Sequence, residues 1–179
     1  MKTTIEPQTW SIDPHHSAAH FSIRHMMISQ VRGMFPDVKG NIDFADDMPT
    51  AFAVTIGVDS LDTGVEERDT HLMSDDFFAA KTHPTMSFVS SKVVKDSKGF
   101  RVTGTMTIKG VSRQVELLVT GLDAANTDPW GNVRRGATAT FSLDRRDYDL
   151  TWNAPIDGGG LLIGNQVDIS VDLEVIQPK

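Results

Sequence analysis

Hydrophobic and polar residues alternate along most of this chain, which is the pattern of β-strands that are buried on one face only. The alternation is clearest in residues 51–59 and recurs in residues 100–108, 115–119 and 167–175. Short turn-forming stretches, such as residues 110–112, separate successive strands. Strands with one polar face and short connections favour an antiparallel sheet with one face in solvent.

A further strand follows a turn at Asp13-Pro14. Phe21 and Ile23 share its apolar face with a single histidine, His25. A buried imidazole without a hydrogen-bonding partner is costly, so we expect His25 to have one. Two interpretations stay open: His25 binds the polar group of a ligand, or a neighbouring strand or Asp69 satisfies it.

Residues 65–81 break the alternation and predict one or two short helices. Ser74 is a candidate N-cap, because two aspartates follow it and negative charge stabilises a helix N-terminus. Pro84 ends the segment before a strand expected at 85–94. Without a repeat, linker or low-complexity stretch, residues 1–179 are interpreted as a single, mainly β domain.

A sheet of seven or eight such strands must bury its apolar face in a two-sheet sandwich or a closed barrel. Several inward positions are small: Ala18, Ala19, Gly104, Ala137 and Ala139. In an eight-stranded barrel these positions could leave room for one elongated apolar ligand, whereas in a sandwich they would let the sheets close. Period-two alternation is compatible with both.

Composition excludes several classes of function. The 179 residues carry a formal net charge of -7, which argues against binding nucleic acid or docking electrostatically on anionic membranes. The chain has no cysteine, so disulfides, thiolate nucleophiles and cysteine-ligated metals are absent.

The chain contains neither a predicted transmembrane helix nor a predicted secretory signal. No apolar run approaches the roughly 18 residues of a transmembrane helix, so stable membrane insertion is not expected. Residues 1–9 lack the apolar core of a secretory signal. We therefore expect a cytoplasmic protein, or a periplasmic or secreted one if a signal has been removed.

Two clusters of polar residues are candidates for a metal site and for an acid–base group. His15, His16 and His20 follow a turn and enter a strand, where positions four apart lie about 13 Å apart and cannot share an ion; no metal site is expected. The triplet Arg68, Asp69 and His71 could supply an acid and a base or could form an ion-pair network that holds the helical segment.

The order and spacing of many short motifs resemble the YceI-like family of lipocalin-like, polyisoprenoid-binding proteins over nearly the whole chain. The blocks that carry the resemblance are Trp10-Ser-Ile-Asp-Pro14, His16-Ser17, Arg24-His25, Val31-Arg-Gly-Met-Phe35, Asp62-Thr-Gly64, Arg68-Asp69, His71-Leu72, Asp76-Phe77-Phe78, His83-Pro84, Thr107-Ile-Lys-Gly-Val111, Arg145 with Asp147-Tyr148, and Gly164.

The resemblance implies an extended eight-stranded antiparallel lipocalin-like β-barrel with a short helical excursion around residues 65–81. It also implies a tunnel for a long apolar chain. Combined with the apolar faces, it leads us to expect these ligand-binding residues: Phe21, Ile23, His25, Phe52, Val54, Ile56, Phe77, Phe78, Phe88, Val102, Met106, Ile108, Phe141, Tyr148, Trp152 and Ile169.

Individual residues have specific expectations. His25 first and Tyr148 second would orient a head group, and Trp152 would follow a strand at residues 145–150. Phe77 and Phe78 would form a lid over the tunnel or ordinary core. Members of the family commonly have Phe-Gly where this chain has Tyr148-Asp149, which places a polar group and a charge in that turn.

The resulting hypothesis is non-catalytic binding, transport or storage of a long-chain amphiphilic lipid: a polyisoprenoid, an isoprenoid quinone or a fatty amide. No catalytic cofactor is expected, and a homodimer is possible. One alternative is an enzyme acting on a lipid or quinone with His25 or the triplet Arg68, Asp69 and His71 as acid and base. The other is a surface interaction or stress module with a filled barrel.

Overall fold

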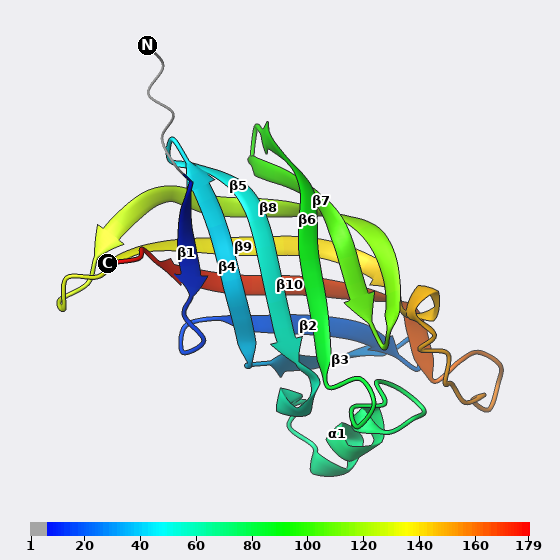
Figure 1. Ribbon diagram of the computed structural model, residues 1–179. Helices are drawn as coiled ribbons and strands as arrows, with labels where there is room; N and C mark the ends of the chain where they lie inside the picture. The colour runs from blue at the N-terminus through cyan, green and yellow to red at the C-terminus, as the bar shows by residue number, and fades with distance from the viewer. Residues whose placement is uncertain (1–6) are drawn as a thin grey trace.

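A computed structural model describes residues 7–179 as a sheet of ten strands with one α-helix (Figure 1). Residues 1–6, part of the segment in which a secretory signal was sought, lie outside the described residues. Among residues 7–179, no helix is both long and apolar enough to cross a membrane. The elements are β1 (Gln8–Ile12), β2 (Ala18–His25), β3 (Ser29–Phe35), β4 (Val38–Ala45), β5 (Met48–Gly57), α1 (Glu66–Met73), β6 (Thr85–Asp96), β7 (Gly99–Ile108), β8 (Val111–Thr127), β9 (Val133–Asp144) and β10 (Ile163–Ile176).

The sheet closes on itself as an antiparallel barrel. Strand β10 pairs with β9 along one edge, and along the other it pairs with β2 and, near its end, with β1. Strand β2 also pairs with β3, and β1 with β4. Strands β1 and β2 thus form one interrupted strand, and β3 and β4 form another. The predicted eight-stranded barrel is confirmed, and the sandwich alternative is wrong.

Both interruptions occur where proline stands. Pro14 lies between β1 and β2, and Pro36 lies between β3 and β4. Proline has no backbone N–H to donate and therefore cannot continue a hydrogen-bonded ladder. Beyond this break β4 pairs with β5, whereas the backbone of β3 forms a single isolated bridge, between Met34 and Asp62, with the segment that follows β5. The segment with α1 covers the barrel at this end (Figure 1).

The helix lies within the segment expected to be helical, but Ser74 does not begin a helix. Helix α1 spans Glu66–Met73, and Ser74 is its C-cap rather than an N-cap. The hydroxyl of Ser74 donates to the carbonyl of His71 at 2.7 Å, so it satisfies the end of the helix, where carbonyls lack partners. The acidic residues of the first turn are Glu66, Glu67 and Asp69.

The strand expected at residues 145–150 is also wrong. Residues Arg145–Tyr148 form a short 3-10 helix, η2, that directly follows β9. Its first turn is capped by Asp144, whose carboxylate accepts from the backbone N–H of Arg146 at 2.9 Å. An aspartate side chain that accepts from a free N–H is a common way to start a helix.

Side chains fill the interior of the barrel at the end away from α1. The largest buried side chains there include Trp10, Phe44 and Phe52, and the guanidinium carbon of Arg135 lies 5.0 Å from the ring centre of Trp10. Gly104, one of the small positions expected to leave room for a ligand, leaves none, because a Cβ atom there would lie 2.6 Å from Cζ of Phe88. The Phe88 ring fills the space that the missing side chain frees.

Two hairpins contain the same turn geometry with different residues. Met26 and Met27 (φ 49° and 61°) belong to the three-residue connection between β2 and β3, which also contains Ile28, and Asp46 and Asp47 (φ 50° and 62°) connect β4 to β5. Aspartate tolerates positive φ well, whereas methionine does not. We expect replacement of Met26-Met27 by Asn-Gly to raise the free energy of unfolding by about 1 kcal/mol, measured by urea denaturation.

The control is Asp46→Asn, which keeps the ion pair of Asp47 with Arg135 and should change the free energy of unfolding little, because Asp and Asn both tolerate positive φ. Equal effects at the two turns would contradict the idea that the methionine turn is strained.

A candidate lipid-binding cavity

A cavity of about 290 Å³ lies at the end of the barrel that α1 covers. Its wall consists mainly of apolar side chains from β2, β9, β10 and the α1 segment. The expected ligand-binding residues that line it are Phe21, Ile23, His25, Ile56, Phe77, Phe78, Met106, Ile108, Phe141, Trp152 and Ile169. Strand parity thus brings residues from most of the chain to one space.

The other expected residues lie outside this cavity. Phe52, Phe88, Val102 and Tyr148 are buried in the core, and Val54 packs against it. Phe52, Phe88 and Val102 point into the barrel from their strands, but at a level that side chains fill. Tyr148 belongs to η2. We therefore omit all five from the proposed ligand contacts.

The floor of the cavity lies between successive inward residues of single strands. Met86 lines the cavity and Phe88, two residues further along β6, does not; in β10 Val171 lines it and Leu173 does not. Inward residues two apart share a face, so they differ only in their level along the barrel. Phe88 is 4% exposed and closes the space at this level.

Several lining residues were not among those expected. Ala19 has the parity of Phe21, and Val167 and Val171 have the parity of Ile169, so the alternation alone could have found them. Arg145 and Leu150 carry no such signal, because η2 and the loop after it have no strand period. The lining residues not predicted also include Val31, Phe35, Arg68, His71, Leu72, Met86, Leu143, Leu162 and Ile163.

The α1 segment contributes an aromatic cluster to the wall. The ring of His71 lies edge-on to Phe77 at 5.1 Å and to Trp152 at 4.8 Å between ring centres. On its other side, Nε2 of His71 lies 2.9 Å from a carboxylate oxygen of Asp76. Phe78 meets Phe35 of β3 edge-on at 5.6 Å. These contacts fix the segment across the end of the barrel.

The triplet Arg68, Asp69 and His71 does not assemble as an acid–base group. Arg68 donates from Nε and Nη2 to the hydroxyl and the carbonyl of Thr63, at 2.7 and 2.8 Å. Asp69 accepts from the backbone N–H of Thr63 at 3.0 Å. Arg68 and Asp69 therefore both fasten the loop before α1, and His71 pairs with Asp76 instead, a partner that the sequence did not indicate.

His25 lies at the C-terminal end of β2 and lines the cavity, half-buried. Among residues 7–179 its imidazole makes no hydrogen bond, and the suggestion that Asp69 satisfies it is wrong, because Asp69 is engaged with Thr63. Both ring nitrogens of His25 are available to a bound molecule.

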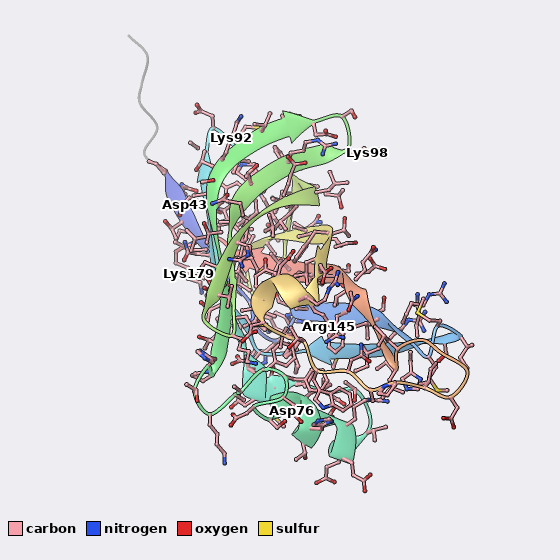
Figure 2. The ribbon with its side chains drawn as sticks, turned by 90° about the vertical axis from the view of Figure 1, so that its right-hand side faces the viewer. Asp43, Asp76, Lys92, Lys98, Arg145 and Lys179 are labelled. Atoms are coloured by element: carbon pink, nitrogen blue, oxygen red, sulfur yellow. The ribbon has the colours of Figure 1, made fainter. Side chains whose placement is uncertain are left out.

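Arg145 is the most deeply buried charged residue of the cavity wall, at 4% exposed. Its Nε donates to the carbonyl of Gly164 at 2.8 Å, and its Nη1 donates to the carbonyls of Leu150 and Trp152 at 2.6 and 2.9 Å. Burial lowers the pKa of the Arg145 guanidinium. The side chain holds η2 and the following loop against β10 (Figure 2).

Of the three N-terminal histidines, His20 borders the cavity from β2, whereas His16 lies elsewhere in the barrel. Ligand atoms of His16, Asp13 and Glu174 lie within 4.8 Å of one another, but Nη1 of Arg134 bonds both carboxylates at 2.6 Å and supplies the positive charge there. Burial alone would raise the pKa of Asp13, but hydrogen bonds from Arg134, His16 and the N–H of His15 lower it well below its usual range. The cluster is an ion-pair network.

Tyr148 is 1% exposed, and its hydroxyl makes no hydrogen bond with the described residues. Burial raises the pKa of this phenol. An unpartnered buried hydroxyl costs about 1–3 kcal/mol. We therefore expect Tyr148→Phe to raise the free energy of unfolding by about 1 kcal/mol, measured by urea denaturation.

Replacing a buried tyrosine by phenylalanine usually lowers the free energy of unfolding, because the tyrosine hydroxyl is usually hydrogen-bonded. A loss here would mean that the Tyr148 hydroxyl has a partner. The neighbouring Asp149 adopts φ 58°, which accounts for the glycine that the family resemblance implies at this position.

Comparison with known proteins gives concordant results. Residues 10–175 match the family described as YceI-like domain. A UPF0312 protein of Pectobacterium carotovorum is 36% identical over 138 residues, which are 76% of this chain and 71% of that protein.

Two solved structures share the fold. The Campylobacter jejuni YCEI protein is 29% identical, with a TM-score of 0.73 over 87% of this chain and 90% of that one. A polyisoprenoid binding domain from Saccharophagus degradans, implicated in plant cell wall breakdown, is 18% identical, with a TM-score of 0.70 over 96% and 99%. At that identity the likeness concerns the fold alone.

Proposed function

This chain belongs to the YceI-like family, and from that membership and the cavity we propose that its barrel binds and carries one long-chain, mainly apolar lipid without changing it chemically. The observation that carries the proposal is a cavity of about 290 Å³ with an apolar wall inside a closed barrel. A space of this kind favours an apolar guest, because water gains few hydrogen bonds from such a wall.

The energetics favour a chain over a compact molecule. Each buried methylene contributes about 0.8 kcal/mol before the ordering costs of binding. The cavity volume lies at the low end for small-molecule sites, and Phe88 closes its floor, so we expect one chain to enter and end near Met86. The Saccharophagus degradans neighbour is described as a polyisoprenoid binding domain, which supports an isoprenoid or isoprenoid quinone as ligand, with a fatty amide as the other candidate.

The polar lining residues indicate the direction of the chain. Four of the five histidines and arginines that line the cavity meet at one end of the barrel: His25 from the end of β2, Arg68 and His71 from α1, and Arg145 from η2. The fifth, His20, lies earlier in β2 and is exposed. A head group would lie among the first four, and the chain would extend toward Met86 and Val171.

Native mass spectrometry of the freshly purified protein, followed by organic extraction and lipid analysis, tests the proposal. We expect a discrete adduct of several hundred daltons that is released as an intact prenyl or fatty lipid. Protein that carries no adduct and also rejects added isoprenoids and fatty amides would refute it. The same spectra report whether a second copy of the chain associates.

A further inference from the structure

Arg145 has donor capacity that the protein does not use. Its Nε and Nη1 bond three backbone carbonyls, whereas Nη2 makes no hydrogen bond with the described residues. The residue is 4% exposed and lines the cavity. Among the described residues no carboxylate forms an ion pair with it, and the neighbouring Asp144 is bound to Arg146. A buried cation without a counterion is costly, and a bound anion would offset that cost.

A second guanidinium lines the same cavity. Arg68 bonds only Thr63, which leaves its Nη1 free among residues 7–179, and it forms no ion pair there. The adjacent Asp69 accepts from Thr63 and does not line the cavity.

The two arginines lie at the same end of the cavity. The carbonyl of Trp152 accepts from Arg145, and the ring of Trp152 lies 4.8 Å from that of His71. His71 follows Arg68 by three residues on α1, so both side chains lie on one face of the helix.

No acidic residue is among the described residues that line the cavity, although the whole chain has a net charge of -7. The cationic side chains of Arg68 and Arg145, by contrast, line the hollow end of the barrel. We propose that the cavity selects lipids with an anionic head group, a carboxylate or a phosphate monoester, which Arg145 binds with support from Arg68. This inference rests on the proposed lipid binding and narrows its ligand class.

The chemistry fits both anions equally. A guanidinium offers parallel N–H donors that match two oxygens of a carboxylate or a phosphate. A neutral amide, alcohol or quinone presents the same chain and a hydrogen-bond acceptor but no charge. Matched pairs of lipids that differ only in the head group therefore isolate the contribution of the arginines.

The test is calorimetric titration of the delipidated protein with such pairs. Hexadecanoate is compared with hexadecanamide, and geranylgeranyl monophosphate with geranylgeraniol. We expect at least one anionic probe to bind about tenfold or more tightly than its neutral partner, as expected for a charge-assisted hydrogen bond in a site shielded from water. Which anion is preferred distinguishes a fatty acid from a prenyl phosphate as the source.

Variants locate the effect. Arg68→Gln should reduce the preference for the anion severalfold, whereas Arg24→Gln, the same charge change on the outward face of β2, should leave it unchanged. Arg145→Lys keeps the positive charge but loses the parallel N–H donors of the guanidinium, and we expect it to lower the preference for the anionic lipid further. Because Arg145 also holds η2, the Arg145→Lys protein could fail to fold. The comparison of Arg68→Gln with Arg24→Gln, together with the wild-type titrations, then still tests the inference.

Equal affinity for charged and neutral partners, or an equal effect of the Arg68 and Arg24 variants, would overturn the anionic preference and leave lipid binding intact. Failure of all four probes to bind would instead overturn the proposed function.

Discussion

Replacement of Ile169 by tryptophan is expected to abolish lipid binding and leave the barrel folded. Ile169 lies in the middle of β10, pairs with Phe141 and Phe21, and lines the cavity. An indole at this position would occupy space that the chain needs. Excluding about four methylenes removes about 3 kcal/mol of transfer free energy, which corresponds to a loss of affinity of about a hundredfold or more.

Extra volume usually strains a well-packed core by about 1–3 kcal/mol, but here the added ring has an empty space to enter. We therefore expect thermal unfolding of the Ile169→Trp protein to stay close to that of the wild type. The control is Ser170→Trp, which adds the same side chain at the next position of β10, on the outer face. If both variants bind lipid normally, the cavity is not the binding site.

Replacement of Phe88 by alanine is expected to have the largest effect on stability and to change the length of chain that the protein accepts. Phe88 is 4% exposed, and its ring lies over Gly104 at the floor of the cavity. Its removal should lower the free energy of unfolding by about 3–5 kcal/mol. The vacated volume would join the existing cavity, because Met86, two residues before it, already lines that cavity.

Phe52→Ala is the matched control, since Phe52 is also 4% exposed but lies in the filled part of the barrel. Both variants should lose similar stability in urea denaturation. Only Phe88→Ala should shift the preferred fatty chain toward greater length in a series of homologous lipids. An unchanged preference would mean that Phe88 does not limit the site.

Much of the fold follows from local sequence. The five inward residues of β7, from Phe100 to Ile108, are all buried, as their alternation predicts. Prolines mark the two interrupted strands, and residues 65–81 contain the predicted helix. The errors, the misplaced cap at Ser74 and the 3-10 helix at Arg145, concern short segments whose side chains bond backbone groups only a few residues away, a pattern that alternation does not register.

The site was predictable only in part, and Phe88 and Met86 illustrate why. Both have the parity that points into the barrel, and parity cannot distinguish a residue that borders empty space from one that fills it. That distinction depends on Gly104, a residue on the neighbouring strand whose missing side chain admits the Phe88 ring. The sequence placed Arg145 in a family motif but did not indicate that it lines the cavity, because its bonding partners are backbone carbonyls of a loop and of β10.

The sequence by itself determined strands such as β5, β7 and β10, the face that each of these buries, and the family, because strand periodicity and short motifs are properties of neighbouring residues. The family resemblance also implied a closed barrel, but the tertiary structure alone decided how the sheet closes, through pairing of β1 with β10, that only one end of the barrel is hollow, and that two arginines face this hollow end. These features depend on the volume and charge that distant side chains leave in a shared space, and no local pattern records that sum.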